Sequence, residues 1–172
     1  MTPSAATRLP VISEPRFNIV LVHPEIPGNT GAVGRTAAAT GCRLHVVHPI
    51  GFDMGESARR RAGLDYWHLV DCVEHESWDA FVASERLDEA GARLWLYTTG
   101  ASQLHWDVAV QPGDYLLFGC ETVGAPEHVR AWAGVERSVT LPMIDDPGAR
   151  SLNLANAVTA AVYEGLRQLA RA

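Results

Sequence analysis

The segment "FNIVLVHPEIPGNTGAVGRTAAATG", residues 17–41, joins an apolar run to a stretch rich in glycine and alanine. Its glycines at positions 28, 31 and 34 are spaced G-x-x-G-x-x-G, whereas a dinucleotide-binding loop requires G-x-G-x-x-G. A P-loop is excluded as well, because it needs G-K-[ST] and the chain contains no lysine. The segment therefore predicts a strand followed by a helix, without either of these nucleotide-binding fingerprints.

The alternation of strand and helix continues to the C-terminus. Strands are predicted at residues 17–23, 43–48, 93–99, 114–119 and 138–142, and helices at 29–40, 77–91, 126–134 and 151–172. Most of these strands lack a regular polar alternation, which is typical of strands covered on both faces. We therefore expect an α/β fold with a mostly parallel sheet flanked by helices, and ligands at the carboxyl ends of the strands.

Polar residues mark the starts of two predicted helices. Asn29 is expected to cap the helix that ends at Gly41, and Ser151 to cap the C-terminal helix. Arg35 is the one charged residue on the first of these helices. It follows Asn29 by just under two turns, so both side chains could flank a site at the start of that helix.

Length and composition predict one globular domain. We expect residues 17–172 to form it and residues 1–16 to be a flexible arm, because that N-terminal stretch lacks the features of a secretory signal. No apolar run approaches the roughly 18 residues of a membrane span, so a membrane protein is not expected. The widely spaced Cys42, Cys72 and Cys120 favour reduced thiols in the cytoplasm over disulfides.

Charge gives a mixed indication about nucleic acids. The formal net charge of −6 is the wrong sign for a protein that holds nucleic acid by long-range attraction. All 14 basic residues are arginines, however, and the planar guanidinium suits recognition of phosphate at a few chosen points. The one concentrated basic cluster is residues 59–61, and a solvated helix face explains it equally well.

Two further groups of residues invite a chemical interpretation. His45 and His48 are three apart on a predicted strand and point to opposite faces, so no metal site is expected. Ser102, His105 and Asp107 suggest a hydrolase triad, but there is no G-x-S-x-G elbow, and triad residues normally converge from separate loops.

Three segments together resemble a known family. "PEIPGNTGAVGRTAAATG", "LFGCETVGAP" and "LPMIDDPGARSLNLANAVTAAVYEGLRQL" resemble, in order and spacing, the three motifs of the SPOUT (SpoU–TrmD) RNA methyltransferases. The likeness runs from about Phe17 to the C-terminus. The segments "RRAGLDYW" and "YTTG" are most similar to members that methylate the ribose 2′-hydroxyl of the wobble cytidine or uridine in the tRNA anticodon.

The resemblance implies a fold, a cofactor and partners. It implies a C-terminal trefoil knot, a homodimer, the tRNA anticodon region as substrate, and neither DNA nor a membrane as partner. It also implies S-adenosylmethionine as methyl donor, S-adenosylhomocysteine as product, and no metal. The cofactor contacts it implies are Tyr97, Thr98, Gly119, Leu141, Met143, Ser151 and Leu152.

The resemblance also assigns residues to catalysis and to RNA. It places Arg35 at the 2′-hydroxyl, with Asn29 and Glu121 shaping the same site. The RNA-binding residues that it implies are Arg150, Asn153 and Asn156. Because guanidinium keeps its proton above about pH 12, Arg35 either accepts a proton only in the special surroundings of the RNA or stays charged and stabilises the developing alkoxide. The second role is physically preferable.

Some residues depart from the family pattern. Cys120 and Val123 stand where proline and arginine are expected, and the loop at 143–151 is about two residues longer than in short relatives. Three alternatives to the function that the resemblance implies are considered. The same reaction could act on another tRNA position or on ribosomal RNA, or the fold could serve as a non-catalytic RNA-binding module. A nucleotide-dependent oxidoreductase is disfavoured by the missing fingerprint.

Overall fold

The computed structural model describes residues 9–170, apart from residues 11, 62 and 90. Residues 1–8 and 11 of the predicted arm therefore lie outside the described residues. Arg16, at the end of that arm, is buried, and its guanidinium donates a hydrogen bond to the carbonyl of Thr40 at 2.9 Å. Arg16, two residues before the first strand, is thus already held against the end of the first helix.

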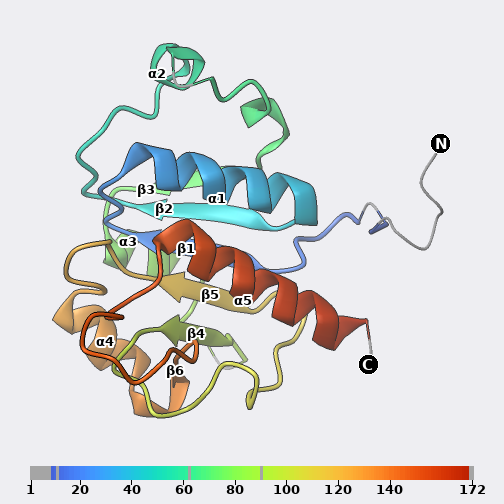
Figure 1. The fold of residues 1–172 in the computed structure, drawn as a ribbon. Helices are drawn as coiled ribbons and strands as arrows, with labels where there is room; N and C mark the ends of the chain where they lie inside the picture. Colours follow the sequence, from blue (N-terminus) through green and yellow to red (C-terminus); the bar gives the residue numbers. More distant parts are fainter. Residues whose placement is uncertain (1–8, 11, 62, 90, 171–172) are drawn as a thin grey trace, which may run out of the picture.

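The centre of the molecule is a parallel sheet of six strands in the order β3-β2-β1-β5-β4-β6 (Figure 1). The strands are β1 (Asn18–Val22), β2 (Arg43–Val47), β3 (Cys72–His75), β4 (Leu94–Tyr97), β5 (Tyr115–Phe118) and β6 (Ser138–Val139). The parallel α/β architecture expected from the sequence is confirmed. The trefoil knot stays a prediction.

Helices cover both faces of the sheet. They are α1 (Pro27–Thr40), α2 (Glu56–Arg61), α3 (Trp78–Ser84), α4 (Glu127–Ala133) and α5 (Leu154–Leu169), with short 3-10 turns η2 (Trp67–Leu69) and η3 (Val135–Arg137). Helices α1 and α5 lie side by side on one face, where the hydroxyls of Thr36 and Thr159 are hydrogen bonded at 2.9 Å (Figure 1). Helix α2 stands apart from the sheet, above α1 in that view.

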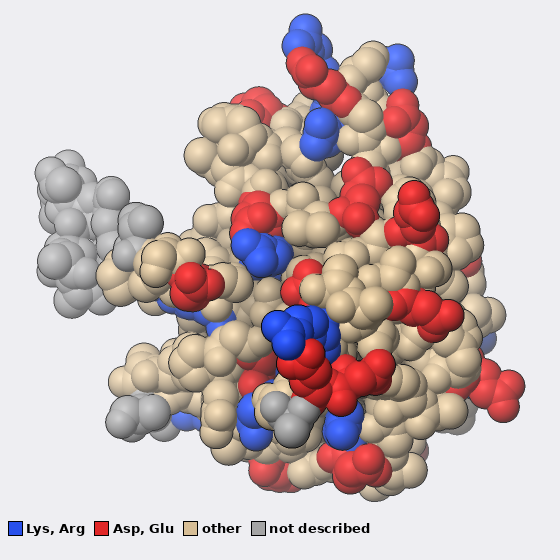
Figure 2. All heavy atoms as spheres, turned by 180° about the vertical axis from the view of Figure 1, so that it is seen from behind, with Lys and Arg blue, Asp and Glu red and all other residues tan. Residues whose placement is uncertain are grey.

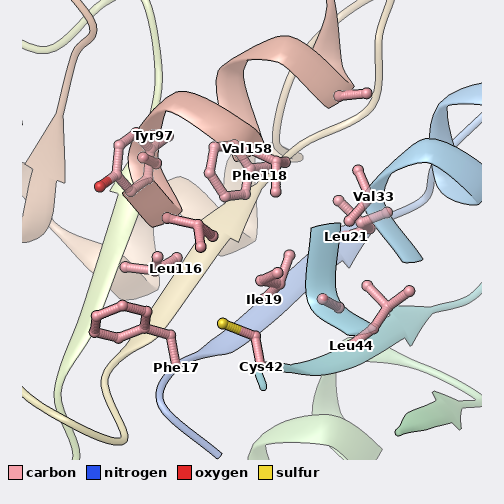
Figure 3. Close-up of a cluster of buried hydrophobic side chains, with 14 of the residues drawn as sticks. Phe17, Ile19, Leu21, Val33, Cys42, Leu44, Tyr97, Leu116, Phe118 and Val158 are labelled. Carbon is pink, nitrogen blue, oxygen red and sulfur yellow. The ribbon is translucent and has the colours of Figure 1, made fainter. Parts of the chain in front are cut away.

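Alternate side chains of each strand supply two separate cores. Ile19 and Leu21 of β1 point into the cluster beneath α1 and α5, together with Val33 and Val158 (Figure 3). The intervening Val20 and Val22 pack instead with residues of α3 and α4. Because successive strand residues face opposite sides, strands buried on both faces must be apolar throughout. This explains why they show no polar alternation.

The structure corrects the predicted starts of two helices and adds a strand that was not predicted. Helix α1 begins at Pro27, so Asn29 lies inside its first turn and is not the N-cap. Proline is favoured there because the first helical amide needs no partner. The cap of α5 is Asn153, whose side chain accepts from the amide of Asn156, so Ser151 precedes the cap. Strand β3 was missed because it is a short edge strand containing Glu74.

Gly41 ends α1 as predicted. It adopts the left-handed conformation with φ 69°, which favours glycine. Throughout the described part of the chain, no helix has the length and apolar character needed to cross a lipid bilayer.

Candidate active site

A cavity of about 750 Å³ opens where the carboxyl ends of β4, β5 and β6 meet the start of α5. We call it the strand-end pocket. It is lined by all seven predicted cofactor contacts, and also by Asn29, Glu121, Arg150 and Asn153. Sequence reasoning missed Phe118 and Thr140 on its wall, although both directly follow or end strands whose carboxyl ends were expected to bind ligand. The structure thus gathers residues from three distant segments at one edge of the sheet.

Gly119 leads from β5 into the tight loop at residues 119–125. A Cβ atom on Gly119 would lie 1.9 Å from the amide nitrogen of Ala125 and 2.1 Å from the carbonyl carbon of Gly124. The loop is closed by paired backbone hydrogen bonds between Cys120 and Gly124, of 3.2 and 3.0 Å. Only glycine fits at position 119, because the obstacle is backbone that no side-chain rotation can clear.

Glu121 ties this loop to the start of α1. One of its carboxylate oxygens accepts from the backbone amide of Glu25 at 2.8 Å. The other accepts from the amide of Ile26 at 3.3 Å and from the side-chain amide of Asn29 at 2.9 Å. In return, the carboxylate of Glu25 accepts from the amide and the hydroxyl of Thr122. Both carboxylate oxygens of Glu121 therefore accept hydrogen bonds from other groups of the protein.

Asn29 extends the connection to the third segment. Its side-chain oxygen accepts from the amide of Asn153 at 3.0 Å, and Asn29 is only 9% exposed. The result is a chain of hydrogen bonds from Glu121 through Asn29 to Asn153, which joins all three motif segments at the pocket rim. Asn29 and Glu121 are thus fixed relative to the loops that they join.

Two predicted site residues lie elsewhere. Arg35 is exposed, does not line the strand-end pocket, and places its guanidinium carbon 4.1 Å from the ring centroid of Tyr66. Six residues of helix turn it roughly 120° away from Asn29. Asn156 is also exposed and outside the pocket lining. Within one chain, the residue expected at the reacting hydroxyl therefore points away from the pocket.

Aromatic side chains form one wall of the pocket. Tyr97 stacks on Phe118 with ring centroids 4.7 Å apart, and both are buried (Figure 3). Burial raises the pKa of the Tyr97 hydroxyl, so it stays protonated over the physiological range. The wall thus offers an uncharged aromatic surface to a ligand.

A second polar cluster lies in the core beside α3. His45 Nδ1 lies 3.0 Å from His75 Nε2, and His45 Nε2 lies 3.3 Å from the side-chain oxygen of Asn18. Donor atoms of His45, His75 and Glu85 all lie within 4.8 Å of one another, a spacing that could surround a metal ion. The two rings are only 20° from parallel with centroids 5.2 Å apart, so one nitrogen points directly at the other. A chain of hydrogen bonds accounts for this geometry.

The two histidines considered together from the sequence have different surroundings. His45 is fully buried, and burial lowers its pKa to about 3. His48 instead contacts the carboxylate of Glu74 at 2.9 Å. The side chains of His45 and His48 therefore have different partners. The expectation that the protein binds no metal stays a prediction.

The sequence is similar to a known protein family and to individual relatives. The model of the SpoU rRNA Methylase family matches residues 16–163. A protein of Saccharophagus degradans called tRNA (cytidine(34)-2′-O)-methyltransferase is 44% identical over 153 residues, which is 89% of this chain and 96% of the relative.

Solved structures agree as well. One described as "Structural insights into the 2-OH methylation of C/U34 on tRNA" matches with a TM-score of 0.79 and 43% identity, over 90% of this chain and 91% of the other. The SpoU methyltransferase AviRb from Streptomyces viridochromogenes, in complex with AdoMet, matches with a TM-score of 0.75 and 26% identity, over 94% of this chain and 63% of AviRb. With its three motif segments joined around one pocket, the chain belongs to the SpoU methylase family.

Proposed function

We propose that this protein transfers a methyl group from S-adenosylmethionine to the ribose 2′-hydroxyl of the wobble cytidine or uridine in tRNA. The observation that carries the proposal is the 44% identity, over 89% of this chain, to a protein named for that reaction at cytidine 34. The structure supports it, because residues 16–163, which the family model matches, include every residue of the strand-end pocket.

The strand-end pocket fits S-adenosylmethionine in size and chemistry. Its volume of about 750 Å³ is in the range of sites that enclose small ligands. The apolar wall of Tyr97, Phe118 and Leu141 suits an adenine ring, while the hydroxyls of Thr98 and Ser151 and the free backbone groups at the strand ends suit its ribose and amino acid part. When bound, the cofactor supplies a methyl group on a positively charged sulfur.

The protein's own residues align the reacting groups. The chain from Glu121 through Asn29 to Asn153 holds three loops at fixed positions around the pocket. Transfer of the methyl group requires an in-line approach, so this rigidity favours the reaction by orientation. Arg150 lines the same pocket and carries a positive charge that suits a phosphate of the RNA.

Arg35 acts, in this proposal, as a permanently charged group that stabilises the developing alkoxide. Its exposed position on α1 requires that the RNA, or a second copy of the chain, bring the pocket and Arg35 together. We therefore include a homodimer in the proposal, with tRNA as its partner and with no DNA or membrane involved. A cytoplasmic location is proposed because the three cysteines are free thiols.

The test is transfer of labelled methyl from S-adenosylmethionine to tRNA that lacks the modification, with the product nucleoside mapped. We expect 2′-O-methylation at nucleotide 34, and a loss of roughly 100-fold or more in kcat for Arg35→Ala. Arg35→Lys keeps the charge but loses the planar guanidinium, so a substantial rate for it would show that a positive charge suffices at this position. Methylation at another tRNA position or in ribosomal RNA would contradict the proposed substrate. Cofactor binding with no transfer to any RNA would indicate a binding module.

A further inference from the structure

A second cavity, of about 400 Å³, lies between the first turn of α1 and helix α2. We call it the α2 pocket. Its apolar side consists of Phe52, Met54, Leu64 and Trp67, and its rim carries Arg59 and Arg61. None of these residues takes part in the strand-end pocket, and all of them belong to the segment between β2 and β3.

The three consecutive arginines of α2 are not equivalent. The guanidinium of Arg60 is paired with Glu56 at 2.9 Å, with both side chains exposed. Arg59 and Arg61 line the α2 pocket, and within the described residues neither forms a salt bridge. Arg59 lies over the ring of Trp67, with its guanidinium carbon 5.6 Å from the centroid. Two positive charges beside an apolar floor are thus left for an external anion.

A threonine with a buried hydroxyl also lines the α2 pocket. Thr30 is 2% exposed, and its Oγ1 atom has no hydrogen-bond partner among the described residues. An unpaired buried hydroxyl is uncommon, because leaving it without a partner costs free energy. Asp53 lines the pocket too, and one of its oxygens accepts from the amide of Gly55 at 2.7 Å. The pocket therefore combines an apolar floor, two cationic groups and two groups that can hydrogen bond.

The α2 pocket and the strand-end pocket are both lined by residues at the start of α1. Ile26 and Asn29 line the strand-end pocket, whereas Pro27 and Thr30 line the α2 pocket, so the first turn of α1 is the wall between them. Helix α2 is at the top of the molecule, where the view from behind shows blue side chains together with red ones, and further blue side chains lie lower on the same face (Figure 2). The run of three consecutive arginines in α2 is the densest basic cluster in the sequence of this acidic protein.

We propose that the α2 pocket receives a base next to the target nucleotide of the RNA, with Arg59 and Arg61 binding the flanking phosphates. The base would rest on the apolar floor, and Thr30 and Asp53 would contact its edge. The inference rests on the proposed function. It explains how a chain with net charge −6 can hold RNA through a few placed arginines.

The first test compares single alanine variants of the three arginines. The probe is an anticodon stem-loop RNA that the wild-type protein methylates, and the measurements are its Kd at several salt concentrations and KM and kcat for methyl transfer. We expect Arg59→Ala and Arg61→Ala each to raise Kd and KM roughly fivefold to tenfold and to lower the salt slope by about 0.7. Arg60→Ala is the matched control and should change Kd less than about twofold.

The second test fills the pocket and removes the base. Ala58, on α2, lines the pocket, so Ala58→Phe should raise Kd for the same RNA while leaving S-adenosylmethionine binding unchanged by calorimetry. An RNA with an abasic nucleotide next to the target should bind more weakly to the wild type. It should then show little further loss with Ala58→Phe, because the base and the new side chain occupy the same space.

The outcomes separate the inference from the proposed function. If wild-type protein methylates the RNA but the pocket variants behave like Arg60→Ala, the pocket does not hold a base and the inference is wrong. A change in oligomeric mass with Ala58→Phe would show that a second copy occupies the pocket, which also overturns it. If wild-type protein neither binds nor methylates any tRNA, the proposed function fails first.

Discussion

Two polar networks in this protein differ in where they lead. The chain Glu121–Asn29–Asn153 runs along the rim of the strand-end pocket and links three loops. The chain Asn18–His45–His75 runs through the core between the sheet and α3, where His45 has no exposed surface. The first network positions loops around a cavity, and the second only fills a packed interior. We therefore expect damage to the first to appear in activity, and damage to the second in stability.

The largest effect is expected at Gly119, beneath the rim network. Gly119→Ala would force a Cβ into the backbone of Gly124 and Ala125, so the loop that carries Glu121 must move. We expect S-adenosylmethionine binding and methyl transfer to fall by at least about 100-fold. Calorimetric titration and the methyl-transfer assay would measure this.

A matched control for Gly119 is available in the loop that follows β2. At Gly51, an added Cβ meets no atom within 4 Å, so Gly51→Ala should leave both binding and thermal stability near wild type. Near-normal cofactor binding by Gly119→Ala would show that the loop is not part of the binding site.

The core network should give a pH-dependent stability. His45 titrates near pH 6.5 when unfolded, but burial lowers its pKa to about 3 in the folded protein, so it folds uncharged. Its contribution is fully present above pH 6.5 and is lost as pH falls from 6.5 toward 3. The expected slope below pH 6.5 is up to about 1.4 kcal/mol per pH unit.

Urea unfolding of wild type and His45→Leu between pH 8 and pH 4.5 measures that slope. The variant removes the titrating group, so its stability should depend less on pH even if it is lower at pH 8. His68, which is exposed, provides the control His68→Leu, whose pH dependence should match wild type. Equal slopes for all three proteins would show that the buried pair is not the source of acid sensitivity.

The smallest effect is expected from Glu121→Gln. The amide keeps the shape but turns a donor toward the amides of Glu25 and Ile26, or toward Asn29. We expect a loss of about 1 kcal/mol of stability, or roughly 2–4 °C in Tm, together with a clear rise in KM for tRNA. Glu76→Gln makes the same chemical change at an exposed site and should alter neither quantity. A lower Tm with an unchanged KM would show that the rim network, like the core network, affects stability and not activity.

The sequence by itself determined the α/β class and five of the six strands, and through the family resemblance it named part of the lining of the strand-end pocket. Apolar runs without alternation and glycine at a helix end depend on local sequence, and both are visible in the printed chain. The resemblance of three motifs named Glu121, Asn29 and Asn153, but the spacing of these residues could not show that their side chains bond to one another.

Only the tertiary structure decided which distant groups meet. His75 was invisible as a partner of His45, because pairing between β2 and β3 is a long-range contact that leaves no periodic pattern in a short edge strand. The different surroundings of Arg59, Arg60 and Arg61 also depend on the turn of α2 against Trp67 and α1. Such contacts depend on how separated segments pack, whereas a sequence pattern records only the local preferences of each segment.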